Sequence, residues 1–189
     1  MGRSGSGKGT QASLLMNLLK KIDPGHPSMS IETGKELRNF IKEPNYTAQV
    51  TKTGMEKGEL MPEFMPIYLW GKLFVSEYTG NEYLFFDGTP RRLMEAKVLD
   101  SVFPFFKLAK PSVIYLDVEH EESVKRLVSR GRELDGHAEI EKRRGWFEVD
   151  VKPTIEYYRT NPNVNFLDID GERSIEEIHA DIVKRLGLA

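Results

Sequence analysis

Apolar residues recur along the chain with two different periods, and their alternation predicts the order of the elements. Helical spacing follows the glycine-rich start, over about 14–22, and stops at Asp-Pro-Gly over 23–25. Short apolar runs typical of buried strands lie at 29–31, 83–88, 113–118 and 164–169. Further helical stretches lie near 37–41, 47–57, 63–78, 92–108 and 174–186. Strands that alternate with helices predict a parallel sheet with helices on both faces, which binds ligands at the carboxyl ends of its strands.

Length, charge and cysteine content narrow the class of protein. A chain of 189 residues fits one α/β domain, and a net charge of −2 gives no reason to expect a nucleic-acid partner. Without cysteine there is no disulfide framework or thiolate zinc site, and the four histidines lack ligand spacing, so no metal site made by the protein alone is expected. No apolar run is long enough for a membrane span. We expect a soluble, cytoplasmic monomer without a membrane partner.

The first ten residues carry the clearest chemical signal. Residues 2–10 read Gly-Arg-Ser-Gly-Ser-Gly-Lys-Gly-Thr, which is nearly the phosphate-binding pattern G-x-x-x-x-G-K-[ST], with Gly9 in place of the hydroxyl residue. Glycines allow successive N–H groups to turn toward a phosphate, and the following helix points its positive end at it. The predicted phosphate site consists of Gly5, Ser6, Gly7, Lys8, Gly9 and Thr10. A flexible glycine-rich tail is the alternative, which the helix that follows directly disfavours.

Four motifs in order resemble those of adenylate kinases and related nucleoside monophosphate kinases. They are Gly-Lys-Gly-Thr-Gln at 7–11, Thr-Gly-Lys-Glu-Leu-Arg at 33–38, Lys-Gly-Glu-Leu-Met-Pro at 57–62 and Asp-Gly-Thr-Pro-Arg at 87–91. The resemblance continues past residue 143. It implies a P-loop NTPase fold of three layers, formed by one domain over 1–189. A small helical insertion for the nucleoside monophosphate is implied over about 32–61, and a short lid over about 130–138.

The resemblance also implies a reaction and the residues that perform it. The γ-phosphoryl group of MgATP would pass to a nucleoside monophosphate, with Mg²⁺ held through the ATP phosphates and water. Catalytic roles fall on Lys8, Asp87, Arg91, Arg132 and Arg143. Beyond the loop, Arg126 would stack on the ATP adenine and Arg130 would help the lid to hold the phosphates. The acceptor site would comprise Thr33, Arg38, Glu59, Leu60, Met61, Gly88, Arg91 and Glu95.

One departure from the family pattern concerns the acceptor base. Adenylate kinases have glutamine where this chain has Glu95. An ionised carboxylate offers acceptors only, which suits the donors of guanine better than the donor and acceptor of adenine. Thr33, in contrast, is the residue typical of adenine-binding members. We expect AMP ahead of GMP, with a GMP-preferring or broad kinase as the alternative. For Glu95 itself, the alternative is a solvated residue on the first turn of its helix.

A second departure lies at the start of the sequence. Members of the family carry an apolar strand directly before the loop, inside the sheet, whereas here only Met1 precedes Gly2. The expectation is an incomplete N-terminus, with unpaired backbone groups and an apolar gap in the sheet. The missing strand favours an alternative function of a different class, that of an inactive nucleotide-binding remnant. A different P-loop phosphotransferase or NTPase is disfavoured, because Gly9 removes the hydroxyl that those proteins place on Mg²⁺.

Overall fold

The computed structural model describes residues 1–131 and 137–188. Its strands are β1 (Ser28–Glu32), β2 (Tyr83–Asp87), β3 (Ser112–Asp117) and β4 (Asn165–Asp170). Its helices are α1 (Lys8–Ile22), α2 (Thr33–Phe40), α3 (Tyr46–Glu56), α4 (Phe64–Glu77), α5 (Leu93–Phe105), α6 (His120–Arg130), α7 (His137–Trp146), α8 (Lys152–Thr160) and α9 (Ile175–Arg185). A π-helical turn, Phe147–Val151, joins α7 to α8. All four predicted strands are present within about one residue of their predicted bounds.

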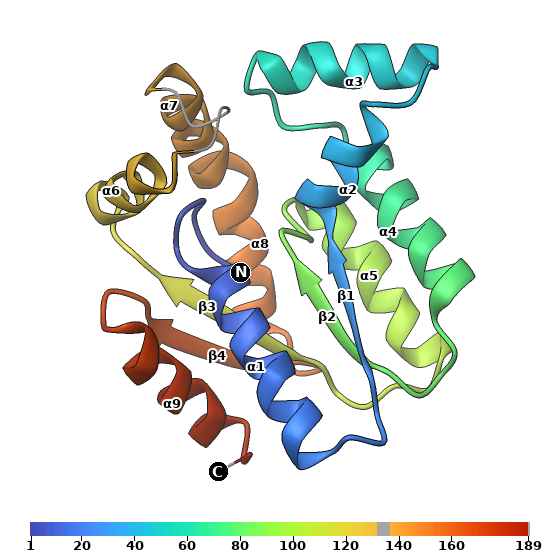
Figure 1. Ribbon diagram of the computed structural model, residues 1–189, viewed down its shortest axis with the longest axis vertical. Coiled ribbons are helices and arrows are strands. Elements are labelled where there is room, and N and C mark those ends of the chain that lie inside the picture. The colour runs from blue at the N-terminus through green and yellow to red at the C-terminus, as the bar shows by residue number, and fades with distance from the viewer. Residues whose placement is uncertain (132–136, 189) are drawn as a thin grey trace.

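The strands form two parallel pairs, β1 with β2 and β3 with β4. Ser28 lies opposite Tyr83 in the first pair, and Ser112 lies opposite Asn165 in the second. Parallel strands need crossover connections, which the helices between them provide. The predicted α/β class with parallel strands is therefore confirmed, although the described residues form two sheets of two strands rather than one continuous sheet (Figure 1).

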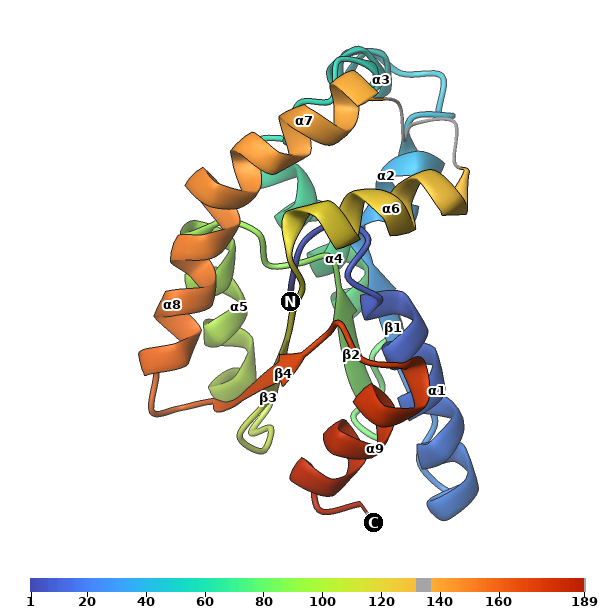
Figure 2. The ribbon, with the colours of Figure 1, turned by 90° about the vertical axis from the view of Figure 1, so that its left-hand side faces the viewer.

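Helices cover the strands from both sides. Helices α1 and α9 contact each other on one face, and α4, α5 and α8 lie on the opposite face (Figure 2). The buried face of α9 packs with β3 and β4 through Ile178 and Ile182. Its start is fixed by the predicted capping box, in which the Ser174 hydroxyl and the Glu177 carboxylate each bond to the other's backbone N–H. These layers leave the carboxyl ends of the strands open at one end of the molecule.

A groove separates the two pairs of strands. Among the described residues, β2 does not pair with β3, and a cavity of about 1620 Å³ runs from the glycine loop down between them. Met1 lies at the upper end of the groove, where its nitrogen donates to the Ile114 carbonyl and its carbonyl accepts from Leu116 N at 3.0 Å. The gap in the sheet that the sequence predicts is thus present.

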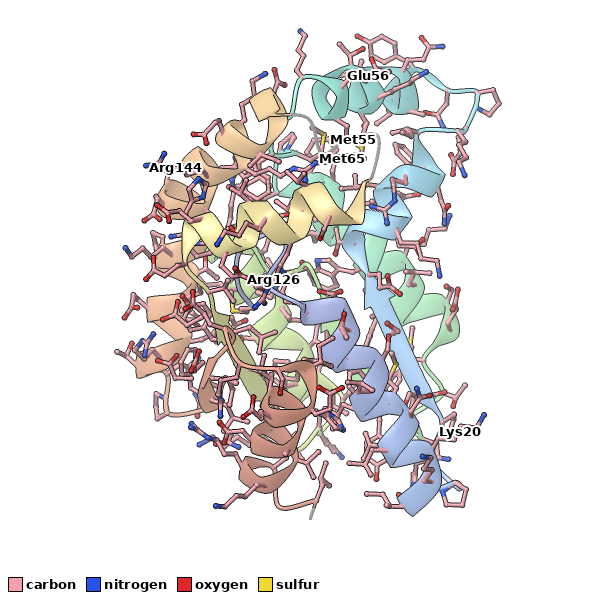
Figure 3. The ribbon with its side chains drawn as sticks, turned by 60° about the vertical axis from the view of Figure 1, so that its left-hand side comes forward. Lys20, Met55, Glu56, Met65, Arg126 and Arg144 are labelled. Atoms are coloured by element: carbon pink, nitrogen blue, oxygen red, sulfur yellow. The ribbon has the colours of Figure 1, made fainter. Side chains whose placement is uncertain are left out.

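Helices α2 and α3, together with the start of α4, stand above β1 and β2 and have a small core of their own. Leu37, Ala48, Met61, Met65 and Leu69 are buried together there, and Met55 packs against them. Figure 3 shows Met55 and Met65 beneath α3. Asn45 begins α3, because its side-chain oxygen accepts from Ala48 N at 2.8 Å. None of the described helices is both long and apolar enough to cross a membrane.

Candidate active site

The glycine loop bends back on itself directly before α1. Gly5 and Gly7 have φ angles of +88° and +92°, a left-handed conformation that favours glycine. A Cβ atom at Gly5 would also lie 2.6 Å from the Ser123 carbonyl on α6, so a larger residue would push the loop away from that helix. The loop therefore brings its backbone close to the positive end of α1, as a phosphate site requires.

Lys8 turns its ammonium group back into the loop. Its Nζ atom donates to the carbonyl of Arg3 at 2.6 Å, to that of Gly2 at 3.0 Å and to the Ser6 hydroxyl at 3.4 Å. Ser6 itself is buried. This arrangement holds a positive charge in the middle of the loop, beside the backbone that surrounds it.

Asp87 ends β2 and lies against the start of α1. Its Oδ2 atom is 3.3 Å from the place that a Cβ atom at Gly9 would take. The carboxylate therefore stands beside the glycine loop at the carboxyl end of a strand, where the sequence predicted it. Among the described residues, no group of three or more histidines and carboxylates could hold a metal ion by itself. A carboxylate beside a phosphate loop fits a hydrated Mg²⁺ that the phosphates would hold.

Arg38, Arg91 and Arg143 converge on the side of the cavity opposite the glycine loop. The Arg91 Nε atom donates to the Gly88 carbonyl at 2.8 Å, which fixes the guanidinium over its own turn. Burial lowers the pKa of the Arg91 guanidinium, the carboxylates of Glu95 and Asp87 raise it, and the positive charges of Arg143 and Arg38 lower it. Three arginines that act on one another inside one cavity make this part of it a candidate site for an anion.

The structure brings most of the predicted site residues to one cavity. On the loop side, the lining includes Gly5, Ser6, Gly7, Lys8, Gly9, Thr10, Asp87 and Arg126. On the other side, the lining includes Thr33, Arg38, Glu59, Leu60, Met61, Gly88, Arg91, Glu95 and Arg143. Arg130 is the last residue of α6, whereas Arg132 lies outside the described residues.

Comparison with known proteins identifies the family. The family model for Adenylate kinase matches residues 1–163. The chain belongs to the adenylate kinase family. Three relatives named adenylate kinase are similar to it over nearly their whole length. The protein from Azobacteroides pseudotrichonymphae is 30% identical, covering 98% of this chain and 94% of its own. The protein from Leptospira biflexa is 31% identical and covers 98% and 97%. The protein from Flavobacterium psychrophilum is 32% identical and covers 94% and 90%.

Membership of the adenylate kinase family makes the chain a phosphotransferase of the nucleoside monophosphate kinase type. The match covers both sides of the cavity, from the glycine loop through the arginines at 38, 91 and 143. The resemblance inferred from the four motifs is therefore confirmed.

Glu95 is not a solvated residue, so that alternative is wrong. Its side chain is only 1% exposed, because α5 turns it inward beneath the Thr89 to Arg91 turn. The Oε2 atom accepts from Arg91 N at 3.0 Å and from the Thr89 hydroxyl at 3.1 Å. The Oε1 atom is buried without a partner among the described residues. Burial raises the pKa of the Glu95 carboxyl above its usual value, which favours the neutral acid.

Arg126 lies beneath α6 on the loop side of the cavity (Figure 3). Its Nε atom donates to Glu122 at 2.8 Å and its NH1 group donates to the Gly171 carbonyl at 2.9 Å. These two bonds hold the flat guanidinium between α6 and the loop after β4. A planar cation fixed in this way presents a face on which an aromatic base can stack.

One residue that lines the cavity and one that lies beside it escaped the sequence analysis. Trp146 lies at the end of α7, and its ring centroid is 5.4 Å from the Arg91 guanidinium carbon. Its Nε1 atom donates to the Gly58 carbonyl at 3.4 Å. Arg92 forms ion pairs with Asp150 at 2.9 Å and Glu63 at 3.4 Å. Both residues link the arm from α7 to α8, which carries Arg143, to the acceptor side of the cavity. The spacing of Trp146 three residues after Arg143 was the only available signal, and it is weak.

Proposed function

We propose that this member of the adenylate kinase family transfers the γ-phosphoryl group of MgATP to AMP and forms two molecules of ADP. One observation carries the proposal: the arginines at 38, 91 and 143 converge on the cavity that the Lys8 loop enters from the other side. A donor phosphate on the loop and an acceptor phosphate on the arginines would therefore meet between them. Phosphoryl transfer needs such positioning and charge rather than covalent chemistry from the protein.

On the donor side, the amides of the glycine loop and the Lys8 ammonium group bind the ATP phosphates. Arg126 binds the adenine of ATP by stacking. The Asp87 carboxylate, which stands next to the loop at Gly9, would hold Mg²⁺ through water molecules. The metal would supply positive charge that neutralises the phosphates.

On the acceptor side, Arg38 and Arg91 hold the phosphate of the monophosphate through their forked donors. Arg143 adds a third positive charge, and the charge that develops on the transferring group is stabilised by all three. The insertion over about 32–61 forms the acceptor pocket with Glu59, Leu60 and Met61. The lid over about 130–138, with Arg130 and Arg132, excludes water so that ATP is not hydrolysed.

Glu95 supports AMP as the acceptor once its burial is taken into account. Both donors that reach the carboxyl bind Oε2, and Oε1 is buried without a partner among the described residues. A base that displaces the groups covering this carboxyl would meet a donor and an acceptor on the neutral acid, the pair that a glutamine amide offers to adenine. On the ionised form it would meet acceptors only, which suit guanine. Burial raises the pKa of this carboxyl, which shifts the balance toward the neutral form.

A coupled assay for ADP formation tests the proposal, with ATP alone and with AMP, GMP, CMP or UMP. We expect turnover that requires an acceptor and is fastest with AMP. Acceptor-independent formation of ADP would instead indicate an NTPase. No turnover from folded, nucleotide-binding protein would indicate an inactive remnant.

A further inference from the structure

The arm from α7 to α8 turns one face toward the segment that carries Arg91. Trp146, Asp150 and Thr154 are four residues apart, a spacing that places side chains on the same face of a helix. The buried Thr154 hydroxyl donates to the Arg91 carbonyl at 3.0 Å. The Arg92 Nε atom donates to Asp150 Oδ1 at 2.9 Å. Figure 2 shows this arm beside α5, which starts directly after these two arginines.

Trp146 is the residue of this face that reaches the cavity. Its side chain is half-buried and lines the cavity on the acceptor side. The ring centroid lies 5.4 Å from the Arg91 guanidinium carbon, which is within the range of a cation–π contact. The Arg91 Nε atom also donates to the Gly88 carbonyl at 2.8 Å. The guanidinium is therefore held at two points, by a carbonyl of its own turn and by the indole ring of the arm.

The same indole contacts the turn at which the predicted acceptor pocket begins. Its Nε1 atom donates to the Gly58 carbonyl at 3.4 Å. Gly58 follows α3 with a φ angle of +68°, and the three residues after it, 59–61, line the cavity. Trp146 itself stands on a packed base, because Phe147, Val151 and Ile155 of the arm are buried together. One rigidly supported side chain thus touches both the phosphate-binding arginine and the pocket beside it.

We propose that Trp146 is a positioning residue for the acceptor: its ring holds the Arg91 guanidinium, and with it the acceptor phosphate, in place beside the pocket that begins at Gly58. This inference rests on the proposed function, since it requires an acceptor phosphate on Arg91. Trp146 acts through Arg91 and the Gly58 turn rather than on the reacting atoms. Its contribution therefore concerns the monophosphate, whereas the glycine loop and Arg126 bind ATP without it.

Two substitutions separate the ring from the rest of the side chain. Trp146→Leu removes the ring, and Trp146→Phe keeps an aromatic face beside Arg91. We expect Trp146→Leu to lower kcat/KM for AMP about tenfold and to change the KM for ATP less than about twofold, because the contact positions only the acceptor clamp. Trp146→Phe should recover most of the loss. If the leucine variant does not fold, Trp146→Met takes its place in the comparison.

Val149→Ala is the matched control, because Val149 belongs to the same arm and is 74% exposed. It should leave both substrate terms unchanged. An unaltered kcat/KM for AMP in Trp146→Leu would overturn the proposal. So would an equal loss in the leucine and phenylalanine variants, or a rise in the KM for ATP as large as that for AMP.

A measurement without nucleotide distinguishes failure of this inference from failure of the proposed function. Nitrogen-15 NMR follows the exchange with solvent of the Arg91 Nε–H group, which is bonded to Gly88. We expect this exchange to be at least about threefold faster in Trp146→Leu and nearly unchanged in Trp146→Phe. Unchanged exchange in the leucine variant would overturn the positioning role, whether or not the protein phosphorylates AMP. Faster exchange together with no AMP-dependent turnover of the unchanged protein would refute the proposed function and support the hold of Trp146 on Arg91.

Discussion

The two pairs of strands have the same parallel architecture but contribute to opposite sides of the site. β1 and β2 end at Glu32 and Asp87, and the residues that follow them form the acceptor side. β3 leads to α6 and Arg126, on the side of the glycine loop. The two pairs do not bond to each other in the described residues. Each half can therefore position its own site residues locally, whereas transfer between two nucleotides depends on how firmly the halves are held together.

Helix α1 and the arm from α7 to α8 join the two halves. Helix α1 contacts β1 and β2 and also packs against α9 of the other half. From the arm, the Lys142 ammonium group donates to the Lys57 carbonyl, and Trp146 donates to Gly58 at 3.4 Å. The glycine loop and the arginines thus reach one cavity, although among the described residues no strand lies between β2 and β3.

The largest effect is expected where the two sides meet. Lys8→Ala and Arg91→Ala should each lower turnover by about 100-fold or more, because each removes a positive charge directed at the transferring group. Steady-state kinetics with ATP and AMP measure the loss. Lys20→Ala is the matched control, since Lys20 is exposed at the far end of α1 (Figure 3) and should leave turnover unchanged. Near-normal turnover in either folded site variant would show that the assigned geometry is wrong.

On the acceptor side, Glu95→Gln should shift the kcat/KM ratio for AMP over GMP toward AMP at a pH above the pKa of the Glu95 carboxyl, where glutamine replaces an ionised carboxylate. Exchange of a bidentate base contact corresponds to about 1 to 3 kcal/mol in this ratio. In the unchanged protein the ratio should fall as pH rises through the pKa of the Glu95 carboxyl, which burial raises, because ionisation removes the donor at Oε1. In the glutamine variant the ratio should not depend on pH. A ratio that Glu95→Gln leaves unaltered at every pH would exclude Glu95 from base recognition.

The raised pKa of the Glu95 carboxyl also predicts how the free energy of unfolding depends on pH. Its pKa in the folded protein lies above the unfolded value of about 4.5, so the folded state binds more protons between the two values. The free energy of unfolding should therefore fall as pH rises from about 4.5 through the folded pKa. Urea unfolding across this range measures the decline, which Glu95→Gln should reduce. An equal decline in both proteins would place its cause elsewhere.

Hydrogen exchange compares the edges of the two halves directly. The Phe86 and Ile114 amides face the groove, whereas those of Phe85 and Tyr115 face their partner strands. We expect exchange of the first two amides to be about tenfold faster or more, since a bonded amide must first open. Uniform protection along β2 and β3 would mean that the groove edges are bonded in solution.

The smallest effect concerns the loop side. Arg126→Ala should raise the KM for ATP several-fold and lower kcat less, because stacking on a base contributes binding rather than charge stabilisation. Arg144→Ala serves as the control, since Arg144 is exposed on α7 and pairs only at 3.4 Å with an exposed Glu141 (Figure 3). An unchanged KM for ATP in the Arg126 variant would remove this residue from the site.

Much of the fold could be predicted because local signals were strong. Short runs rich in apolar residues identified the four strands of the described residues, and the Ser174 to Glu177 capping box identified the start of the last helix. The helix expected over 92–108 ends at Phe105, where Pro104 and the left-handed Lys107 terminate it. The helix over 152–160 carried no clear signal. Its buried face, with Ile155 and Tyr158, depends on partners distant in sequence, such as Ala96.

Site residues that belong to sequence motifs could be predicted. Those whose position depends on packing between distant segments could not. The loop and the arginines at 38, 91 and 143 lie in recognisable segments, and the structure brings them together. The burial of Glu95 was missed, since an isolated glutamate on a first helical turn is usually solvated. Its inward position follows from two donors of the preceding turn, which only the folded chain shows. Trp146 was missed because its contact with Gly58 joins segments 88 residues apart.

The central claim is that the two sides of the cavity exchange a phosphoryl group between two nucleotides. Phosphorus NMR of one sample containing the protein, Mg²⁺, ATP and AMP measures this directly, because each nucleotide and inorganic phosphate give separate signals. We predict that ATP and AMP disappear in equal amounts, that two ADP appear for each AMP consumed, and that inorganic phosphate does not accumulate. Loss of ATP with release of inorganic phosphate and no loss of AMP would contradict the account.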